Sequence, residues 1–306
     1  MHSHSHSHGL EARRGDSRRR MWVALAINGA MLVAEAVGGV LTGSLAVLAD
    51  AGHLLSDVGS IGLALFAAAL AARPAGARMT FGYQRSEILA ALVNGLLLVV
   101  VAIAIAYAAI GRLGDPPEID GLGVLGLGLF GLFGNIVATV VLARGQREDV
   151  NLEGVLRHSA ADALGSLGVI IAGAFVLVGG SSIVDPVVSL AIAALILLSS
   201  WRLISEPVGV LMEAAPAGFD VDAAGAAICE EDGVRSVHDL HIWTVTSGFG
   251  ALAAHVVVSP DCDRDLVRRR IELLLHERFG IDHTTLQMEE QAPEGLLHVE
   301  NAPGQG

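Results

Sequence analysis

The sequence predicts an α-helical membrane protein, with six transmembrane helices followed by a small α+β domain. Three observations support this prediction. Hydrophobic residues make up 53% of the 306 residues and charged residues only 17%, whereas a typical soluble domain carries about 25% charged residues. Six apolar segments reach the roughly 20 residues that a helix needs to cross a bilayer. After Glu206 the pattern changes, because charges become frequent and apolar runs shorten to strand length.

Each predicted transmembrane helix is an apolar stretch bounded by charged or turn-forming residues. The six stretches cover residues 21–41, 45–71, 88–110, 122–143, 155–178 and 183–204, so the membrane domain spans 21–206. A polar tail rich in histidine and arginine, residues 1–20, precedes them. Many of the 37 glycines fall inside these stretches, which is typical of closely packed membrane helices.

Residues 207–292 are predicted to form a domain with the element order α-β-β-α-β. A helix over 219–233 begins near an aspartate cap. Two strands, over 234–245 and 250–258, are joined by a glycine-bearing hairpin. A second helix over 263–280 ends at Gly280, a typical C-cap, and a third strand covers 283–289. The helices are expected to cover one face of the sheet, and residues 293–306 are expected to be a flexible tail.

Charge predicts the orientation of the chain and the kind of partner it has. All positive side chains are arginines, because the chain contains no lysine, and they gather before the first helix, between the second and third, and around the fourth connection. The positive-inside rule then places both termini on the cytoplasmic side of the membrane, which we expect to be an inner or plasma membrane. Residues 207–306 hold 17 Asp and Glu but only 6 Arg, which argues against nucleic acid and favours cations.

Two pairs of ionisable residues interrupt the apolar stretches. His53 and Asp57 lie in "DAGHLLSD", and His158 and Asp162 lie in "RHSAAD". A spacing of four residues places each pair on one helix face, and ionisable groups in a bilayer cost a few kcal/mol each. Two imidazoles and two carboxylates match tetrahedral Zn²⁺. The absence of thiolates disfavours Cu(I), and Ca²⁺ or Mg²⁺ would need more oxygen ligands or retained water. The alternative is a pair of unrelated His–Asp hydrogen bonds that tie helices together.

The same chemistry indicates how transport would be driven. Imidazole binds metal only when neutral, so protons and metal compete for its nitrogen near physiological pH. The sequence therefore favours Zn²⁺/H⁺ antiport by alternating access. Asp50 lies on the face of His53 one turn away and is a candidate gate, a group supporting the ligands, or a packing hydrogen bond. Asn28, Glu35 and Asn94 are interpreted as packing groups first and ion-path residues second.

Four segments, "GSLAVLADAGHLLSDVGS", "FGYQRSEILAALVNG", "LRHSAADALGSLGVI" and "VHDLHIWTV", together resemble the cation diffusion facilitators, and in particular their bacterial zinc-type efflux members. The resemblance implies a homodimer of six-helix protomers with a cytoplasmic ferredoxin-like domain. It implies proton-coupled export of Zn²⁺, with Cd²⁺ or other divalent transition metals as further substrates. Its transport site would comprise His53, Asp57, His158 and Asp162, and a histidine at position 53 resembles the zinc-preferring members.

The resemblance also implies a regulatory metal site in the cytoplasmic domain. The matching residues would be His238, His255, His283 and Glu289, with His241 as a further candidate. Gln287 stands where some members have a ligating histidine, so a full binuclear site is not implied. Family members often have a histidine-rich loop between helices four and five. Here the histidines lie in "MHSHSHSHG", as His2, His4, His6 and His8. This tract is either a low-affinity metal collector, a dispensable tail or an added tag.

Three function classes were compared. A membrane metalloenzyme would carry His-Glu-x-x-His or multiple histidine boxes, and neither pattern occurs in the sequence. A membrane metal sensor would bind metal without moving it, and it would not need ligands inside the bilayer. A secondary transporter does need them, and the absence of a phosphate-binding loop indicates an ion gradient as its energy source. We therefore expect a non-enzymatic exporter, with a sensor that shows no flux as the alternative.

Overall fold

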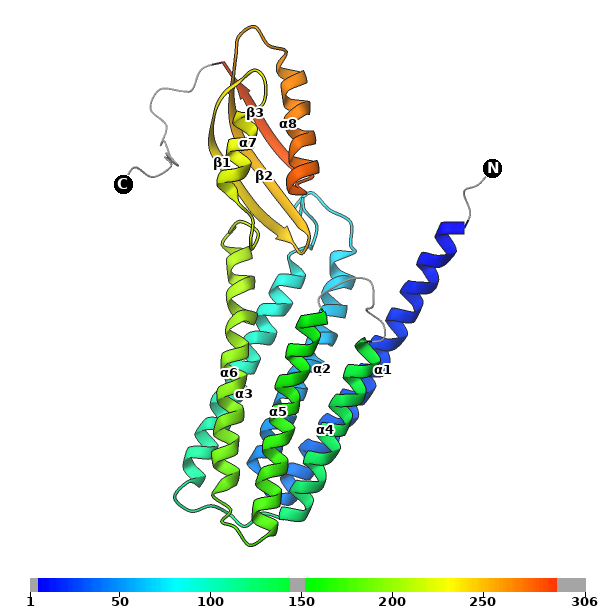
Figure 1. The fold of residues 1–306 in the computed structure, drawn as a ribbon, viewed down its shortest axis with the longest axis vertical. Coiled ribbons are helices and arrows are strands. Elements are labelled where there is room, and N and C mark those ends of the chain that lie inside the picture. The colour runs from blue at the N-terminus through cyan, green and yellow to red at the C-terminus, as the bar shows by residue number, and fades with distance from the viewer. Residues whose placement is uncertain (1–4, 144–151, 291–306) are drawn as a thin grey trace. The chain divides into compact units, whose positions relative to one another are not determined.

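The computed structural model describes the backbone of residues 5–143 and 152–290 (Figure 1). Side chains are described throughout these ranges except at residues 5–21, 24, 64, 142–143 and 152–161. The first six elements are long helices, as predicted. They are α1 (Ser5–Thr42), α2 (Leu45–Ala71), α3 (Ser86–Arg112), α4 (Gly121–Ala143), α5 (Leu152–Leu177) and α6 (Val184–Leu211). The helix α1 begins well before residue 21, because the prediction counted only its apolar length.

The chain divides into two compact units. One comprises Met1–Phe66 with Ala90–Ile204, and the other comprises Ala67–Leu89 with Ser205–Gly306. We call them the membrane unit and the cytoplasmic unit. The short segment before α3 therefore belongs with the C-terminal domain rather than with the bundle.

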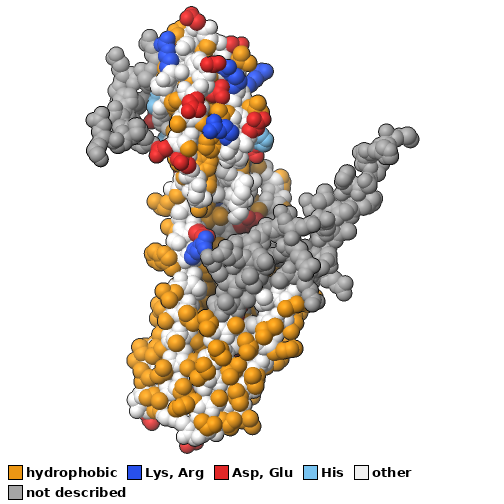
Figure 2. All heavy atoms as spheres, in the orientation of Figure 1, with side chains coloured by type: hydrophobic (Ala, Val, Ile, Leu, Met, Phe, Trp, Pro, Cys, Tyr) orange, Lys and Arg blue, Asp and Glu red, His pale blue; other side chains and the backbone are white. Residues whose placement is uncertain are grey.

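The long helices have the length and composition of membrane spans. Within the described residues, five helices carry apolar windows long enough to cross a bilayer, and α5 adds a shorter apolar stretch, Asp162–Leu177. Large apolar side chains point outward on these helices; Tyr107 is 82% exposed and Leu198 is 74% exposed. Figure 2 shows hydrophobic side chains spread over the visible surface of the helices, with charged side chains gathered over the C-terminal domain. These findings confirm the predicted membrane domain followed by an α+β domain.

Glycines bring α4 and α5 into backbone contact. A Cβ added at Gly173 would stand 2.4 Å from the backbone nitrogen of Leu125, and one added at Gly128 would stand 2.9 Å from the backbone nitrogen of Ile170. Such approaches exclude any side chain, so these positions require glycine. The buried core beside this contact is built from small and aliphatic residues of α2 to α6, including Ala46, Ala102, Val124, Val169 and Ala193.

A buried carboxylate joins α6 to the start of α2. Asp185 is 1% exposed and accepts hydrogen bonds from Ser44 Oγ at 2.5 Å, Leu45 N at 2.8 Å and Ala46 N at 3.2 Å. The first backbone N–H groups of a helix have no partner within the helix, so Asp185 supplies the acceptor from another helix. Its negative charge also complements the positive end of the α2 dipole. This contact positions α2, the helix that carries His53 and Asp57.

The C-terminal domain has the predicted element order. It contains α7 (Val221–Cys229), β1 (Val234–Thr246), β2 (Phe249–Val258), α8 (Arg264–Phe279) and β3 (His283–Glu289). The sheet order is β1-β2-β3, with β1 and β2 antiparallel and β2 and β3 parallel. Asp220 and Asp263 cap α7 and α8, and Gly280 ends α8 at a φ of 67°. Aliphatic side chains of both helices and the sheet form the core, including Ile228, Leu252, Val256, Ile271 and Leu275.

Candidate metal sites

The membrane unit brings one histidine and two aspartates together between α2 and α5. His53 Nε2 lies 2.9 Å from Asp162 Oδ1 and 3.9 Å from Asp57 Oδ2. One ligand atom from each of the three residues lies within 4.8 Å of the other two. His53 and Asp57 share a face of α2 because they are four residues apart. Thus three of the four residues predicted for the transport site converge on one point.

The fourth predicted ligand lies outside the described side chains. His158 is on α5, four residues before Asp162, so helical spacing places it on the same face. The three described ligands are largely buried, with side-chain exposures of 13–16%. A site this size, with nitrogen and oxygen donors and limited water access, suits a divalent transition metal better than a hard cation that needs six or more oxygens.

Asp50 does not join this cluster of ligand atoms. Its side chain is 5% exposed and accepts a hydrogen bond from Ser166 Oγ of α5 at 3.2 Å. Ser166 in turn accepts a hydrogen bond from Asn135 Nδ2 of α4 at 3.2 Å. Of the three roles that the sequence allows for Asp50, the structure shows a helix–helix hydrogen bond one turn from the ligands. Ser166 and Asn135 were missed, although Ser166 follows Asp162 at helical spacing.

A second cluster lies on the sheet of the cytoplasmic unit. Glu289 Oε2 is 3.1 Å from His238 Nε2, and Glu289 Oε1 is 2.8 Å from His255 Nδ1. The two imidazole rings are 5.0 Å apart. Asp239 Oδ2 lies 3.6 Å from His238 Nδ1 and adds a second carboxylate. Asp239 was not predicted, and its φ of 48° reflects an irregularity in β1 that the sequence does not reveal.

The other two histidines predicted for this site lie elsewhere on the sheet. The strand register pairs His238 with His255 and Gln287, whereas His283 pairs with Ala251. Four residues along β2 correspond to about 13 Å, so His283 cannot reach the cluster. Its ring instead makes edge contacts with Phe249 and Phe81. Of the five predicted residues, the structure brings together His238, His255 and Glu289, a selection that depends on strand register and that residue type alone does not show.

Hydrogen bonds determine the charge state of Glu289. Partial burial alone would raise the pKa of its carboxyl, but hydrogen bonds from His255, His238 and Gln287 outweigh that effect and hold the pKa below its ordinary value. Gln287 Nε2 donates to Glu289 Oε1 at 2.7 Å. The amide at position 287 therefore orients the carboxylate, instead of adding a ligand as a histidine would.

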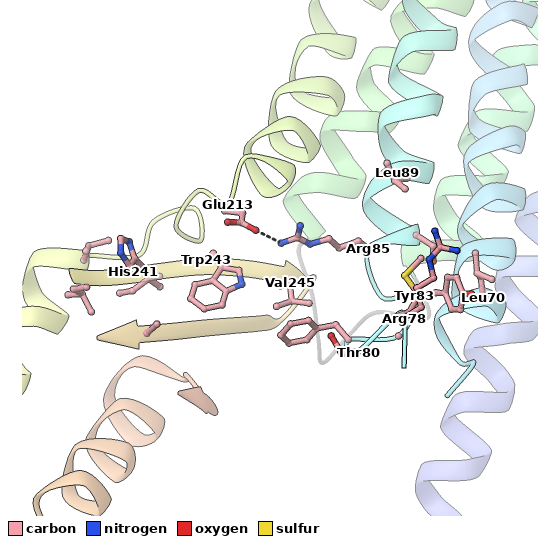
Figure 3. Close-up of a pocket in the computed structure, with 18 residues that line it drawn as sticks. Leu70, Arg78, Thr80, Tyr83, Arg85, Leu89, Glu213, His241, Trp243 and Val245 are labelled. Carbon is pink, nitrogen blue, oxygen red and sulfur yellow. Dashed lines mark hydrogen bonds and ion pairs between the residues drawn. The ribbon is translucent and has the colours of Figure 1, made fainter. Parts of the chain in front are cut away.

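The segment before α3 packs against β1 within the cytoplasmic unit (Figure 3). Arg85 Nη2 lies 3.3 Å from Glu213 Oε1, and Thr246 Oγ1 donates to Glu87 Oε2 at 3.2 Å. These contacts border an open pocket of about 960 Å³, which His241 and Trp243 also line. His241 therefore faces this pocket rather than the metal cluster.

Similarity to known proteins extends over nearly the whole chain. Residues 21–212 match the cation efflux transmembrane domain, and residues 216–291 match the cytoplasmic domain of cation efflux proteins. The chain is 38% identical over 294 residues to a cadmium, cobalt and zinc/H(+)-K(+) antiporter of Bacillus velezensis, covering 94% of this chain and 92% of that protein. It is 37% identical over 296 residues to the zinc transporter ZitB of Escherichia coli K12, covering 96% and 93%.

Among solved structures, a metal-bound C-terminal domain of the CzcD transporter of Cuprividus metallidurans is 36% identical. The match covers 23% of this chain and 99% of that one, with a TM-score of 0.23. The family match spans the helices that hold His53, Asp57 and Asp162 as well as the sheet that holds the second cluster. The chain belongs to the cation efflux family, the cation diffusion facilitators.

Proposed function

We propose that this protein exports Zn²⁺ from the cytoplasm across the membrane in exchange for protons, by alternating access. The observation that carries the proposal is the convergence of His53, Asp57 and Asp162 between two membrane helices. One relative named as a zinc transporter, and another named as a cadmium, cobalt and zinc/H(+)-K(+) antiporter, support the same function. Cd²⁺ and other divalent transition metals are further candidate substrates, since cadmium and cobalt occur in the name of one relative.

The site geometry accounts for exchange between metal and proton. His53 Nε2 stands between two carboxylates, at 2.9 Å from Asp162 and 3.9 Å from Asp57. A protonated imidazole would pair with them, whereas bound Zn²⁺ needs the same nitrogen unprotonated. Metal and proton therefore occupy the site in alternation. His158 would complete four ligands, the number that Zn²⁺ prefers.

We further propose how the chain is placed and assembled. Arginine-rich connections put both termini on the cytoplasmic side of an inner or plasma membrane. Residues 21–206 would form the transport domain and 207–292 the cytoplasmic domain, with 1–20 and 293–306 as tails. The match to the cytoplasmic domain of cation efflux proteins supports a homodimer in the lipid bilayer. No chemical conversion is required of this protein, so we expect it to be a transporter and not an enzyme.

The cytoplasmic cluster is proposed to bind regulatory Zn²⁺. His238, His255 and Glu289 present two imidazoles and a carboxylate whose hydrogen-bonded atoms are 2.8–3.1 Å apart, a donor set that Zn²⁺ accepts. Bound metal would hold β1, β2 and β3 together through its ligands. The tract of His2, His4, His6 and His8 remains a predicted metal collector. His2 and His4 lie outside the described residues, and so do the side chains of His6 and His8.

Reconstitution in proteoliposomes tests the proposed function. In wild-type protein, protons moving down an imposed pH gradient are expected to drive Zn²⁺ in the opposite direction. Asp57→Ala and Asp162→Ala should each abolish that zinc flux. Asp115→Ala serves as the control, because Asp115 is exposed and lies in the connection between α3 and α4. Zinc binding without flux would support a metal sensor instead. Flux that persists in both aspartate variants would refute the site.

A further inference from the structure

Glu35 of α1 has an unusual environment in the membrane unit. It is 2% exposed, and neither of its carboxylate oxygens has a hydrogen-bond partner among the described residues. The sequence pattern favours a packing group over an ion-path residue at this position, but a packing group would be hydrogen-bonded. An unpaired carboxylate charge inside a membrane protein costs several kcal/mol. Glu35 therefore needs a companion cation, either a proton on the carboxyl or a bound ion.

Four helices converge on the same point. A Cβ added at Gly131 of α4 would stand 2.6 Å from Glu35 Oε1 and 3.2 Å from Ser166 Oγ, so these two oxygens share the space that glycine leaves open. Ser166 of α5 is fully buried. It donates to Asp50 Oδ2 of α2 at 3.2 Å and accepts from Asn135 of α4 at 3.2 Å. We call Glu35, Asp50, Ser166 and Asn135 the oxygen cluster.

The oxygen cluster is distinct from the metal ligands but adjacent to them. Asp50 precedes His53 by three residues on α2, and Ser166 follows Asp162 by four residues on α5. One helical turn, about 5.4 Å, therefore separates the two groups along both helices. The displacement is toward the N-terminus of α2 and the C-terminus of α5, which is the outer side in the proposed orientation.

The donor chemistry of the two groups differs. The metal ligands include imidazole nitrogen, which suits Zn²⁺, whereas every acceptor atom of the oxygen cluster is an oxygen, and its donors are the Ser166 hydroxyl and the Asn135 amide. Facing Glu35, the only titratable group among the described residues of the cluster is Asp50. The groups from α4 and α5 are the neutral Asn135, Gly131 and Ser166. Asp50 also interacts electrostatically with His53, Asp57 and Asp162. A change of charge at the metal ligands therefore changes the electrostatic potential at the oxygen cluster.

We propose that Glu35 binds a second counter-transported proton, in addition to the one that competes with metal at His53, at a station separate from the metal ligands. The inference rests on the proposed Zn²⁺/H⁺ antiport. A proton from the outer side binds the Glu35 carboxylate, and Ser166 has a second acceptor lone pair available for it. When Zn²⁺ binds one turn away, its two positive charges favour release of that proton. Glu35 thereby gains a proton when the metal leaves and loses it when metal binds.

The test counts the protons released per Zn²⁺ bound by purified full-length protein, using a pH indicator in weak buffer. Glu35→Gln keeps the shape of the side chain but cannot ionise, so the count should fall by about one. Glu35→Asp keeps the carboxyl and should retain the count. Thr42→Val is the matched control, because Thr42 lies seven residues along the same helix and donates to backbone oxygens of that helix, at Gly38 and Gly39. It should leave the count unchanged.

A second measurement does not depend on the folding of Glu35→Gln. In infrared difference spectra between zinc-bound and zinc-free protein, wild type should lose a protonated-carboxyl band that shifts in frequency in Glu35→Asp. An unchanged proton count in Glu35→Gln, or a band that does not move in Glu35→Asp, would overturn the proposal. The proposal would also be overturned if the number of protons released per Zn²⁺ changed with the K⁺ concentration and not with pH. Wild-type zinc flux without any proton movement would contradict the antiport itself, whereas coupled flux with unaltered Glu35 variants contradicts this inference alone.

Discussion

Substitution of Asp185 by Asn tests how the membrane unit holds α2 in place. The Asp185 carboxylate accepts a hydrogen bond from Ser44, just before α2, at 2.5 Å and two from the first residues of α2 at 2.8 and 3.2 Å, and Asp185 is 1% exposed. Asparagine has nearly the same size but carries no charge, and one of its terminal atoms is a donor. The variant therefore weakens all three bonds and turns one acceptor against the donors that face it.

The expected loss follows from these contacts. A hydrogen bond to a charged group contributes about 1.5–3 kcal/mol, against about 0.5–1.5 kcal/mol for a neutral pair. Weakening three buried bonds by about 1 kcal/mol each predicts a loss of about 3 kcal/mol in the free energy of unfolding. Arg112 adds little, because its Nη1 is 4.0 Å from the carboxylate and its side chain is 31% exposed. Its Nη1 donates instead to the backbone oxygen of Gly43 at 2.8 Å.

The assay is reversible unfolding of purified protein in mixed micelles, followed by helical circular dichroism. Asp115→Asn is the matched control, because Asp115 is exposed on a connection of the same unit, and it should change the free energy by less than about 0.5 kcal/mol. If Asp185→Asn unfolds like Asp115→Asn, the carboxylate does not hold α2 and the reasoning is wrong.

Three further predictions concern packing and charge. Gly173→Ala should destabilise the bundle by several kcal/mol, since the added Cβ would meet the α4 backbone at 2.4 Å. Gly126→Ala, whose added Cβ has nothing within 4 Å, should be neutral or stabilising by up to about 1 kcal/mol. Unfolding in mixed micelles compares the two variants, and equal effects would contradict the packing argument. The lowered pKa of Glu289 means that its contribution to stability is present above the unfolded pKa of about 4.3 and disappears as the pH falls through the lower folded value. In metal-free protein, hydrogen exchange of β3, corrected for intrinsic rates, should therefore accelerate on acidification in wild type but much less in Glu289→Gln, and parallel profiles would refute this. The Arg85–Glu213 pair, 38% and 66% exposed, should show a coupling energy below about 1 kcal/mol in a double-mutant cycle, falling with salt; a larger, salt-independent value would contradict its exposure.

The sequence was sufficient for the helices and for the pairing of His53 with Asp57. Hydropathy predicts spans of about the right length because the bilayer fixes that length, and helical spacing makes residues four apart share a face. The α-β-β-α-β order of the C-terminal domain could be predicted for a similar reason. Its caps at Asp220, Asp263 and Gly280 are local signals, so they can be recognised without tertiary structure.

Contacts between distant segments could not be predicted in this way. Asp185 and Ser44 are 141 residues apart, and nothing in the local sequence links them. His283 and His255 are on neighbouring strands, but the register places them four residues apart, and register depends on how whole strands pair. The irregularity near Asp239, with its φ of 48°, also follows from the assembled sheet. Among the five residues expected for this site, only those at nearby register positions of the three strands lie together.

The polar residues inside the membrane unit show why tertiary contacts decide between packing and ion handling. Asn94 accepts a hydrogen bond from Ser56, and Asp185 accepts three, so packing accounts for both. Asp50 accepts one, from Ser166, whereas Glu35 accepts none among the described residues. All four are polar residues in apolar segments, and the sequence does not show how many hydrogen-bond donors surround each of them. Because a buried carboxylate without a donor must take up a cation, the number of donors around each one, and not its position in the sequence, identifies Glu35 as a residue that exchanges a proton in addition to His53.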